Sequence, residues 1–395
     1  MKISRREFLV RSSQATLFSS LASPLLARPS ERNPQPVVPD YPSGAVPLHF
    51  LGQQSSGRSL GTTFGVPWGL GETTKEDKFV IRTTDGQHRV KTSARPLAYW
   101  PDGSIKWSAI SVGEQINTLL DIKRPIVLTR DSENEETDSM EVKVVEKEIV
   151  VKNGLLKAVF GTTGNTLLKE IRQGGKLLGS DVVSELILQD TIQDVDTQQT
   201  RQFHWNMHVQ TVNVENATET RTVVKVEGIH GHGDEVKIPF IVRFYFYQGV
   251  ASIRIVHTFI YDGDDQIDFI KGLGLSIKLP MDKAPSFNRY VRFVEANGRV
   301  FKEAVKGLTG LRRDPGISVR QAQIAGKEIT IDQMAESVQR GLPYIPEFAS
   351  YRLVQSSDQA YTIQKRTKTG YSWLQSARGQ RSSGIAYLGT PSGGV

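Results

Sequence analysis

Residues 236–247 read VKIPFIVRFYFY, and this stretch decides the fold class. Apolar side chains recur at every second position, which is the pattern of a β-strand with one buried face. The other face mixes cations with tyrosines, so it is expected to meet a ligand or a further layer of protein. The predicted buried face comprises Val236, Ile238, Phe240, Val242, Phe244 and Phe246, and the opposite face comprises Lys237, Arg243, Tyr245 and Tyr247.

Similar strand-like runs surround this stretch and are joined by short polar connections. They predict long antiparallel strands in meander order over residues 139–345, for which a β-sandwich is the default architecture. Helical patterning is confined mainly to Ile331–Arg340, which Gly341 and Pro343 end. The strand-like runs are Met140–Val151, Leu155–Phe160, Val182–Gln189, Met207–Val214, Arg221–Ile229 and Ala251–Tyr261.

A shorter β-rich region precedes the predicted sandwich. From residue 46 to residue 131, brief apolar runs such as Ile105–Val112 alternate with turn signals such as Asp85-Gly86, which predicts a small all-β domain. The acidic stretch Asp131–Asp138 has no apolar residue and is expected to be a solvated boundary loop. Its carboxylates would also suit calcium, although the Gly hinge and distal Glu of a calcium-binding hand are missing.

The first 30 residues have the layout of an export signal. A basic head containing Arg5-Arg6, followed by Phe8-Leu9, leads into an apolar stretch rich in small residues. We therefore expect a twin-arginine signal peptide over residues 1–30, with the twin-arginine translocase as a partner. The mature protein is then expected to be periplasmic or secreted. Residues 31–45 are rich in proline and predict an extended linker.

Composition narrows the classes of function. The chain has 395 residues and a formal net charge of +7; residues 1–30 carry +4 of it, so the remainder carries +3. So small an excess argues against nucleic acid as a partner. Outside the predicted signal, no apolar run approaches the ~20 residues of a membrane-spanning helix, so no span is expected in the mature chain. The absence of cysteine excludes disulfides, thiolate metal sites and thiol nucleophiles.

Two groups of side chains in the predicted sandwich are candidates for binding or chemistry. His204 and His208 share a face of a predicted strand, which would suit a metal pair or two polar groups lining a groove. Pairs of this kind are also common as surface residues. Arg243, Tyr245 and Tyr247 would suit a sugar acid, because guanidinium pairs with carboxylate and aromatic rings stack on pyranose faces. The alternative is a strand whose tyrosines pack under another layer.

The C-terminal residues 346–395 are expected to complete the sandwich and to connect it to a further domain. They contain a loop-rich part that combines aromatic rings, arginines and flexible backbone, and such loops often hold ligands. The alternative is that the same side chains dock a downstream segment, because the chain stops on an apolar residue directly after a glycine turn. The candidate side chains are Tyr371, Trp373, Arg378 and Arg381, and the last residue is Val395.

Three separated parts of the chain resemble one protein family. The first is similar to the signature of the N-terminal RIFT-barrel domain of YetA-like proteins and exo-rhamnogalacturonan lyases. The second resembles the central β-sandwich of that family, and the third matches the passage into its α/α-toroid domain. The segments that carry the resemblance are Thr63–Trp68 and Arg95–Trp107, then His257–Asp264, Asp268 and Gly272–Leu275, and finally Gly379–Gly384 and Ser392–Val395.

The resemblance implies a small N-terminal RIFT-type β-barrel followed by a larger antiparallel β-sandwich, with little helix and without the toroid. It also implies a polysaccharide lyase that acts on rhamnogalacturonan or a related uronate-containing glycan, with an acidic polysaccharide or oligosaccharide as its partner. A non-catalytic glycan-binding or structural β-module, or an inactive fragment, stays the alternative. No cofactor is expected, and a calcium ion that supports the fold or bridges carboxylates stays open.

The implied β-elimination requires a group that neutralises the uronate carboxylate, a base for the C5 proton and an acid for the departing oxygen. Tyrosine, histidine, lysine and arginine fill these roles without a thiol, which agrees with the cysteine-free composition. On chemistry alone, the candidates for proton transfer are His204, His208 and Tyr371. The candidates for substrate binding are Arg243, Tyr245, Tyr247, Trp373, Arg378 and Arg381.

Overall fold

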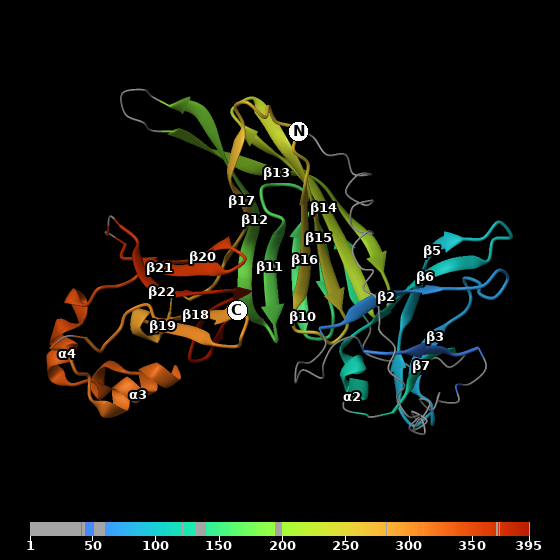
Figure 1. The fold of residues 1–395 in the computed structure, drawn as a ribbon, viewed down its shortest axis with the longest axis horizontal. Helices are drawn as coiled ribbons and strands as arrows, with labels where there is room; N and C mark the ends of the chain where they lie inside the picture. Colours follow the sequence, from blue (N-terminus) through green and yellow to red (C-terminus); the bar gives the residue numbers. More distant parts are fainter. Residues whose placement is uncertain are drawn as a thin grey trace, which may run out of the picture. The chain divides into compact units, whose positions relative to one another are not determined.

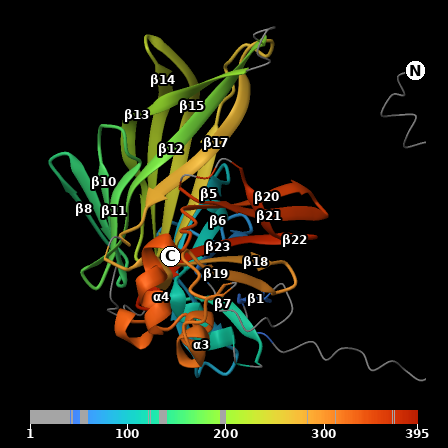
Figure 2. The ribbon, with the colours of Figure 1, turned by 90° about the vertical axis from the view of Figure 1, so that its left-hand side faces the viewer.

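The computed structural model describes residues 41, 44–50, 60–120, 122, 124–131, 140–193, 200–281, 283–310, 312–368, 370 and 372–394. The predicted signal peptide, most of the predicted linker and the acidic stretch after Asp131 lie outside these residues, as do Tyr371 and Val395. Strands account for 56% of the structure and helices for 9%, so the prediction of an all-β chain with little helix is confirmed. Figures 1 and 2 show the strands from two directions.

Two small antiparallel sheets form the N-terminal region. One has the strand order β1-β7-β3-β4 and the other the order β2-β6-β5. Ile110 of β6 is buried and belongs to the same apolar core as Ile81 of β3, because alternate side chains of both sheets turn inward. The elements are β1 (Val46–Leu48), β2 (Thr62–Pro67), β3 (Phe79–Thr83), β4 (Arg89–Lys91), β5 (Ser93–Tyr99), β6 (Ile105–Val112), η1 (Glu114–Ile116), α2 (Asn117–Leu120) and β7 (Ile126–Arg130).

The central region is a ten-stranded antiparallel assembly with the order β16-β15-β14-β13-β12-β11-β10-β9-β8, in which β17 also pairs with β12. Most of its buried apolar side chains form one core, where Phe160 meets Phe244 and Phe246 edge to face, and a smaller cluster surrounds Trp205. The strands are β8 (Glu141–Val145), β9 (Glu148–Lys152), β10 (Leu156–Gly161), β11 (Leu168–Gln173), β12 (Lys176–Gln193), β13 (Thr200–Ala217), β14 (Arg221–His232), β15 (Glu235–Tyr247), β16 (Ile253–Phe259) and β17 (Phe269–Lys278).

The C-terminal region forms two further sheets beside a small helical cluster. Their strand orders are β19-β18-β23-β24 and β20-β21-β22. Because β18 pairs with β23, one sheet contains strands from both sides of the expected division at residue 345. The strands are β18 (Tyr290–Glu295), β19 (Val300–Ala304), β20 (Ser350–Ser357), β21 (Ala360–Arg366), β22 (Leu374–Gly379), β23 (Ser382–Thr390) and β24 (Gly393–Gly394). The helices are η2 (Ser286–Asn288), α3 (Ile317–Ala325), η3 (Ile331–Gln333), α4 (Glu336–Gly341) and η4 (Leu342–Tyr344).

The helical cluster has its own core. Val319 of α3 and Val338 of α4 are buried together with Phe287 and Leu308. The helix predicted over Ile331–Arg340 is therefore two short helices, η3 and α4, and α3 adds a helix that the sequence pattern did not indicate. No helix among the described residues is both long and apolar enough to cross a membrane.

The stretch that decided the fold class is strand β15, but its alternation breaks at the N-terminal end. Phe240, Phe244 and Phe246 are fully buried as predicted. Val236 is 57% exposed, which contradicts its place on the buried face. The physical reason is an irregularity in the β14–β15 register between Gly228 and His230, which shifts the strand beyond Phe240.

Candidate functional site

A serine and two histidines from three strands of the sandwich share hydrogen bonds. Ser184 lies on β12, His230 on β14 and His257 on β16. The Oγ of Ser184 is 2.9 Å from Nε2 of His230 and 3.3 Å from Nε2 of His257. The Nδ1 of His230 is 2.8 Å from the carbonyl oxygen of Ile238 on β15. The four groups therefore form one continuous chain that ends at the His257 ring.

The partners of each group determine where its proton lies. A carbonyl oxygen only accepts hydrogen bonds, so the contact with Ile238 requires a proton on Nδ1 of His230. In a neutral imidazole Nε2 is then an acceptor, and it receives the hydroxyl proton of Ser184. The Ser184 oxygen in turn accepts from Nε2–H of His257. The lone pair of the neutral His257 ring therefore lies on Nδ1.

Burial keeps both imidazoles neutral. His230 is fully buried and Ser184 is 2% exposed, whereas His257 is only partly buried. Burial lowers the pKa of His230, against the opposing effect of its hydrogen bond to Ile238. Burial also lowers the pKa of His257, and the charge of His230 acts in the same direction. A neutral histidine with an unprotonated Nδ1 is a proton acceptor near neutral pH.

The backbone of Ile238 is strained at this point. Its φ is +52°, a conformation that a β-branched residue rarely adopts. Its carbonyl oxygen faces His230, and its N–H donates to Oδ1 of Asp262 at 2.6 Å. Strained backbone of this kind persists only where the surroundings hold it, and it concentrates at functional sites. The hydrogen bonds to Asp262 and His230 fix the Ile238 backbone, and its side chain is fully buried in the cluster around Trp205.

The loop that follows β16 is fixed by an ion pair. The Nζ of Lys237 lies 2.8 and 2.7 Å from the two carboxylate oxygens of Asp268. Tyr261 donates its hydroxyl proton to the carbonyl oxygen of Asp268. The hydrogen bond to Asp268 raises the pKa of Lys237. Burial acts to raise the pKa of Asp268, but hydrogen bonds from Lys237 and from the N–H of Asp264 outweigh it and lower the pKa.

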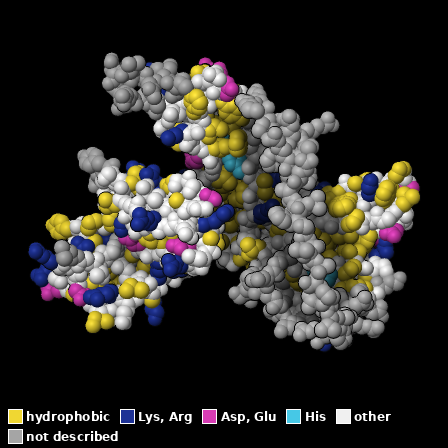
Figure 3. Space-filling view, in the orientation of Figure 1, with side chains coloured by type: hydrophobic (Ala, Val, Ile, Leu, Met, Phe, Trp, Pro, Cys, Tyr) yellow, Lys and Arg dark blue, Asp and Glu magenta, His cyan; other side chains and the backbone are white. Residues whose placement is uncertain are grey.

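Apolar side chains beside His257 are left uncovered. His257 pairs across the strands with Val242, and Phe259 with Phe240, so both face the core side of the sheet. Phe259 is nevertheless 44% exposed, and Leu275, which pairs with Ser184 from β17, is 38% exposed. Figure 3 shows histidine atoms near the centre of the view, bordered by hydrophobic side chains. The partly buried imidazole therefore lies beside apolar side chains that are exposed to solvent.

The predicted proton-transfer residues lie elsewhere. His204 and His208 share the exposed face of β13, opposite the buried Trp205 and Met207. The inner face, through the sulfur of Met207, is the one that contacts Ser184. The two predicted histidines therefore belong to a different surface from His257. The third candidate, Tyr371, lies outside the described residues.

Each member of the predicted platform of Arg243, Tyr245 and Tyr247 contacts other parts of the chain. Arg243 donates from Nε and Nη2 to the carboxylate of Glu215 at 2.8 and 3.0 Å, and this hydrogen bonding raises the pKa of the arginine. Tyr245 lies under the guanidinium of Arg254. Tyr247 is 5% exposed, because it packs between the N-terminal region and the sandwich.

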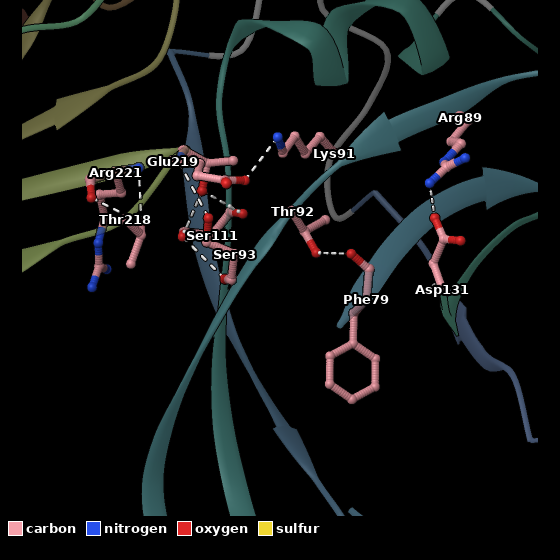
Figure 4. Close-up of polar contacts among 11 residues, drawn as sticks. Phe79, Arg89, Lys91, Thr92, Ser93, Ser111, Asp131, Thr218, Glu219 and Arg221 are labelled. Atoms are coloured by element: carbon pink, nitrogen blue, oxygen red, sulfur yellow. Dashed lines mark hydrogen bonds and ion pairs between the residues drawn. The ribbon is translucent and has the colours of Figure 1, made fainter. Parts of the chain in front are cut away.

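Polar contacts join the N-terminal region to the sandwich around Tyr247. Its hydroxyl lies 3.0 Å from Oγ1 of Thr63, which also accepts from Nη1 of the buried Arg221. The ring fits against Gly61, where a Cβ would lie 2.4 Å from Cγ of the tyrosine. Ser111, which Figure 4 labels among the neighbouring contacts, is also hydrogen-bonded to Thr220 at 2.9 Å. The junction is therefore a polar interface with defined partners.

A cavity of about 210 Å³ lies next to this junction. Lys91 and Glu219 form an ion pair at 2.8 Å on its wall, and Thr92 donates to the carbonyl oxygen of Phe79 (Figure 4). Four cations and three carboxylates line the cavity, and the ion pairs Lys91–Glu219 and Arg89–Asp131 neutralise most of this charge, which leaves little for a ligand to match.

The remaining candidates lie on or next to the small β20–β22 sheet. Trp373 directly precedes β22, Arg378 is on β22, and Arg381 is in the connection to β23. The structure brings Trp373 together with two arginines that are not among the predicted site residues, since the guanidinium carbons of Arg352 and Arg366 lie 4.1 and 4.7 Å from its ring centroid. The local concentration of positive charge in the sequence was the signal that would have found them.

Metal ligation receives no support from the described residues, in which no three His, Asp or Glu side chains gather as ligands. The acidic stretch considered for calcium continues beyond Asp131 into residues outside that part of the chain. The two histidines of the site, His230 and His257, instead share a hydroxyl group.

Comparison with known proteins agrees with this architecture. Residues 44–124 match the PcRGLX-like N-terminal RIFT barrel domain, and residues 140–395 match the PcRGLX-like protein central beta sandwich domain. The chain belongs to the PcRGLX-like family. It is similar to the uncharacterized protein YetA of Bacillus subtilis (strain 168), with 28% identity over 349 residues. The match covers 85% of this chain and spans 38% of the length of that relative.

Proposed function

We propose that this chain belongs to an exported carbohydrate-active protein that cleaves rhamnogalacturonan, or a related uronate-containing glycan, by β-elimination. Membership of the PcRGLX-like family supports the substrate class. The observation that carries the chemistry is His257, a neutral imidazole held by Ser184 with its lone pair on Nδ1 beside an exposed apolar rim. Export by the twin-arginine route is part of the proposal and rests on residues 1–30.

In the proposed step, Nδ1 of His257 removes the C5 proton of a bound uronate. The electrons of the C–H bond form the C4–C5 double bond while the C4–O bond breaks. The departing oxygen takes a proton from an acid, and the products are an unsaturated uronate and a free hydroxyl group. The proton gained by His257 is stabilised through Ser184, whose oxygen remains the acceptor of Nε2–H.

The test incubates the full chain with rhamnogalacturonan and follows the ultraviolet absorbance of the unsaturated product. His257→Gln is expected to lower the rate at least about 100-fold, because general-base catalysis contributes factors of this size. His88→Gln is the matched control, since His88 is exposed in the N-terminal region. Absence of unsaturated product on any uronate glycan, from a folded chain, would refute the elimination.

A non-catalytic glycan-binding module is the second candidate function. It is supported by the match to YetA, which covers only 38% of the length of that protein. It predicts measurable binding of oligogalacturonides without turnover. Calorimetry combined with product analysis on the same sample separates the two functions.

A further inference from the structure

One small sheet near the C-terminus carries an excess of positive charge. Residues 350–381 contain six Lys or Arg and a single acid, Asp358, so they carry +5 of the total net charge of +7. Residues 1–30 carry +4, which leaves −2 for the rest of the chain. Outside the predicted signal, the sheet β20–β22 with its flanking residues is therefore a segment with a clear excess of positive charge.

The strand register places three arginines on one face of this sheet. Arg352 of β20 pairs with Gln364 of β21, and Arg366 is two positions further along β21. Arg378 of β22 pairs with Thr362, again two positions from Gln364. Because alternate residues of a strand share a face, all three arginines point to the same side, and all three are exposed. Figure 3 shows Lys and Arg side chains spread over this part of the surface.

Two of these guanidinium groups converge on one aromatic ring. Arg352 and Arg366 both lie over Trp373, and Nε of Arg352 donates to Oε1 of Gln364 at 2.7 Å. These contacts hold the guanidinium groups along the sheet surface. Within the described part of the chain neither arginine forms an ion pair, and the same is true of Arg378. Like charges held close together at an exposed surface are favoured when an anion joins them.

On the opposite face of the same sheet, two polar side chains are paired with carboxylates. Lys365 is bonded to Glu303, and the hydroxyl of Tyr361 donates to Oε1 of Glu295 at 2.5 Å. That face packs on the β18–β19 hairpin, and its charges are matched. The arginines on the outer face therefore differ from the other cations of this sheet in having no carboxylate partner there.

We propose that the outer face of the β20–β22 sheet, with Arg352, Arg366, Arg378 and Trp373, binds the carboxylates of an acidic polysaccharide. The planar guanidinium fork matches a carboxylate with two parallel hydrogen bonds, and the indole offers an apolar edge to the sugar ring. The identity of the ligand rests on the proposed function. The binding itself is separate from the chemistry at His257, which lies on another sheet.

The experiment measures binding of the full chain to polygalacturonate by calorimetry. The variant Arg352→Gln/Arg366→Gln is expected to weaken binding at least about tenfold, because hydrogen bonds between charged groups are among the strong ones. The control Arg320→Gln/Arg340→Gln removes the same formal charge from two exposed arginines that pair with Asp314 and Glu336, and it is expected to change binding less than about twofold. Far-ultraviolet circular dichroism confirms that each variant is folded.

Three further arms decide the ligand class. Fully methyl-esterified polygalacturonate, which lacks the charges, is expected to bind at least about tenfold more weakly, as is a DNA duplex. Equal binding of the ester, equal or tighter binding of DNA, or an equal loss in the control variant would each overturn the proposal. His257→Gln is expected to bind polygalacturonate normally. Binding of polygalacturonate without elimination would therefore refute the proposed reaction but not the proposed binding surface. Elimination by a chain whose double arginine variant still binds polygalacturonate normally would refute the binding surface but not the reaction.

Discussion

Removal of the Ser184 hydroxyl tests the chain of hydrogen bonds at the site directly. In Ser184→Ala, Nε2 of His230 loses its partner in a fully buried position. An unsatisfied buried acceptor costs about 1–3 kcal/mol. The second bond, from His257, is longer at 3.3 Å, and its imidazole is only partly buried and turns to water. The free energy of unfolding is therefore expected to fall by about 2 kcal/mol, nearly all of it from His230.

Urea unfolding measures this change if the slope with denaturant stays constant. Ser276→Ala is the matched control, because Ser276 lies on the neighbouring strand β17 and its hydroxyl bonds an exposed Glu185. Its effect is expected to stay within about 0.5 kcal/mol. A loss in Ser184→Ala no larger than in this control would refute the assignment of the buried hydrogen bond.

Nitrogen-15 spectra of the histidine rings test the proton positions independently of stability. His230 is expected to carry its proton on Nδ1, and His257 on Nε2, in the native chain. In Ser184→Ala the constraint on His257 is lost, so its ring is expected to populate both tautomers. A native His257 with its proton on Nδ1 would contradict the role proposed for that nitrogen as a base.

Three further changes have defined outcomes. Asp268→Asn is expected to lower the free energy of unfolding by about 2–3 kcal/mol, measured in urea. This is less than for a fully buried ion pair, because Lys237 is partly exposed. Since the pKa of Asp268 is lowered, the stabilisation by this carboxylate is present above about pH 4 and is lost as the pH falls. Tyr247→Phe removes the hydrogen bond to Thr63 and is expected to cost about 0.5–1.5 kcal/mol by thermal unfolding. Because the pKa of His230 is lowered in the folded chain, the unfolded chain binds more protons than the folded chain below about pH 6.5. The free energy of unfolding is therefore expected to rise with pH through that region. A free energy of unfolding that does not change with pH there would contradict the burial of His230.

Strand identity could be predicted well from alternation, because the pleat gives buried strands a period of two. The core phenylalanines of β15 illustrate this, since Phe240, Phe244 and Phe246 are all buried. The same pattern failed at Val236, where a register irregularity opposite His230 changes the phase of the strand. Such irregularities depend on the neighbouring strand, so a single stretch of sequence does not reveal them.

The candidate site was harder to predict because its members come from distant strands. The strand predicted over Arg221–Ile229 stopped just before His230, but β14 continues to His232 and His230 is fully buried. Ser184 carried no signal at all. The contact between these residues requires the pairing of β12, β13, β14, β15 and β16 in that order, which is information about the whole sheet. The arginine face was partly predicted, through Trp373 and Arg378, because the charge of that segment is visible in the sequence.

The motif HTFIYDGD at residues 257–264 gains a physical explanation from this arrangement. Its first residue, His257, is bonded to Ser184, and its sixth, Asp262, holds the N–H of the strained Ile238. The carbonyl oxygen of Ile238 in turn orients His230, the other partner of Ser184. Two residues of the motif thus act on the same hydrogen-bonded chain, His257 through its own ring and Asp262 through the backbone of Ile238. The sequence signature that resembles the family therefore contains two residues, His257 and Asp262, that belong to this network of hydrogen bonds.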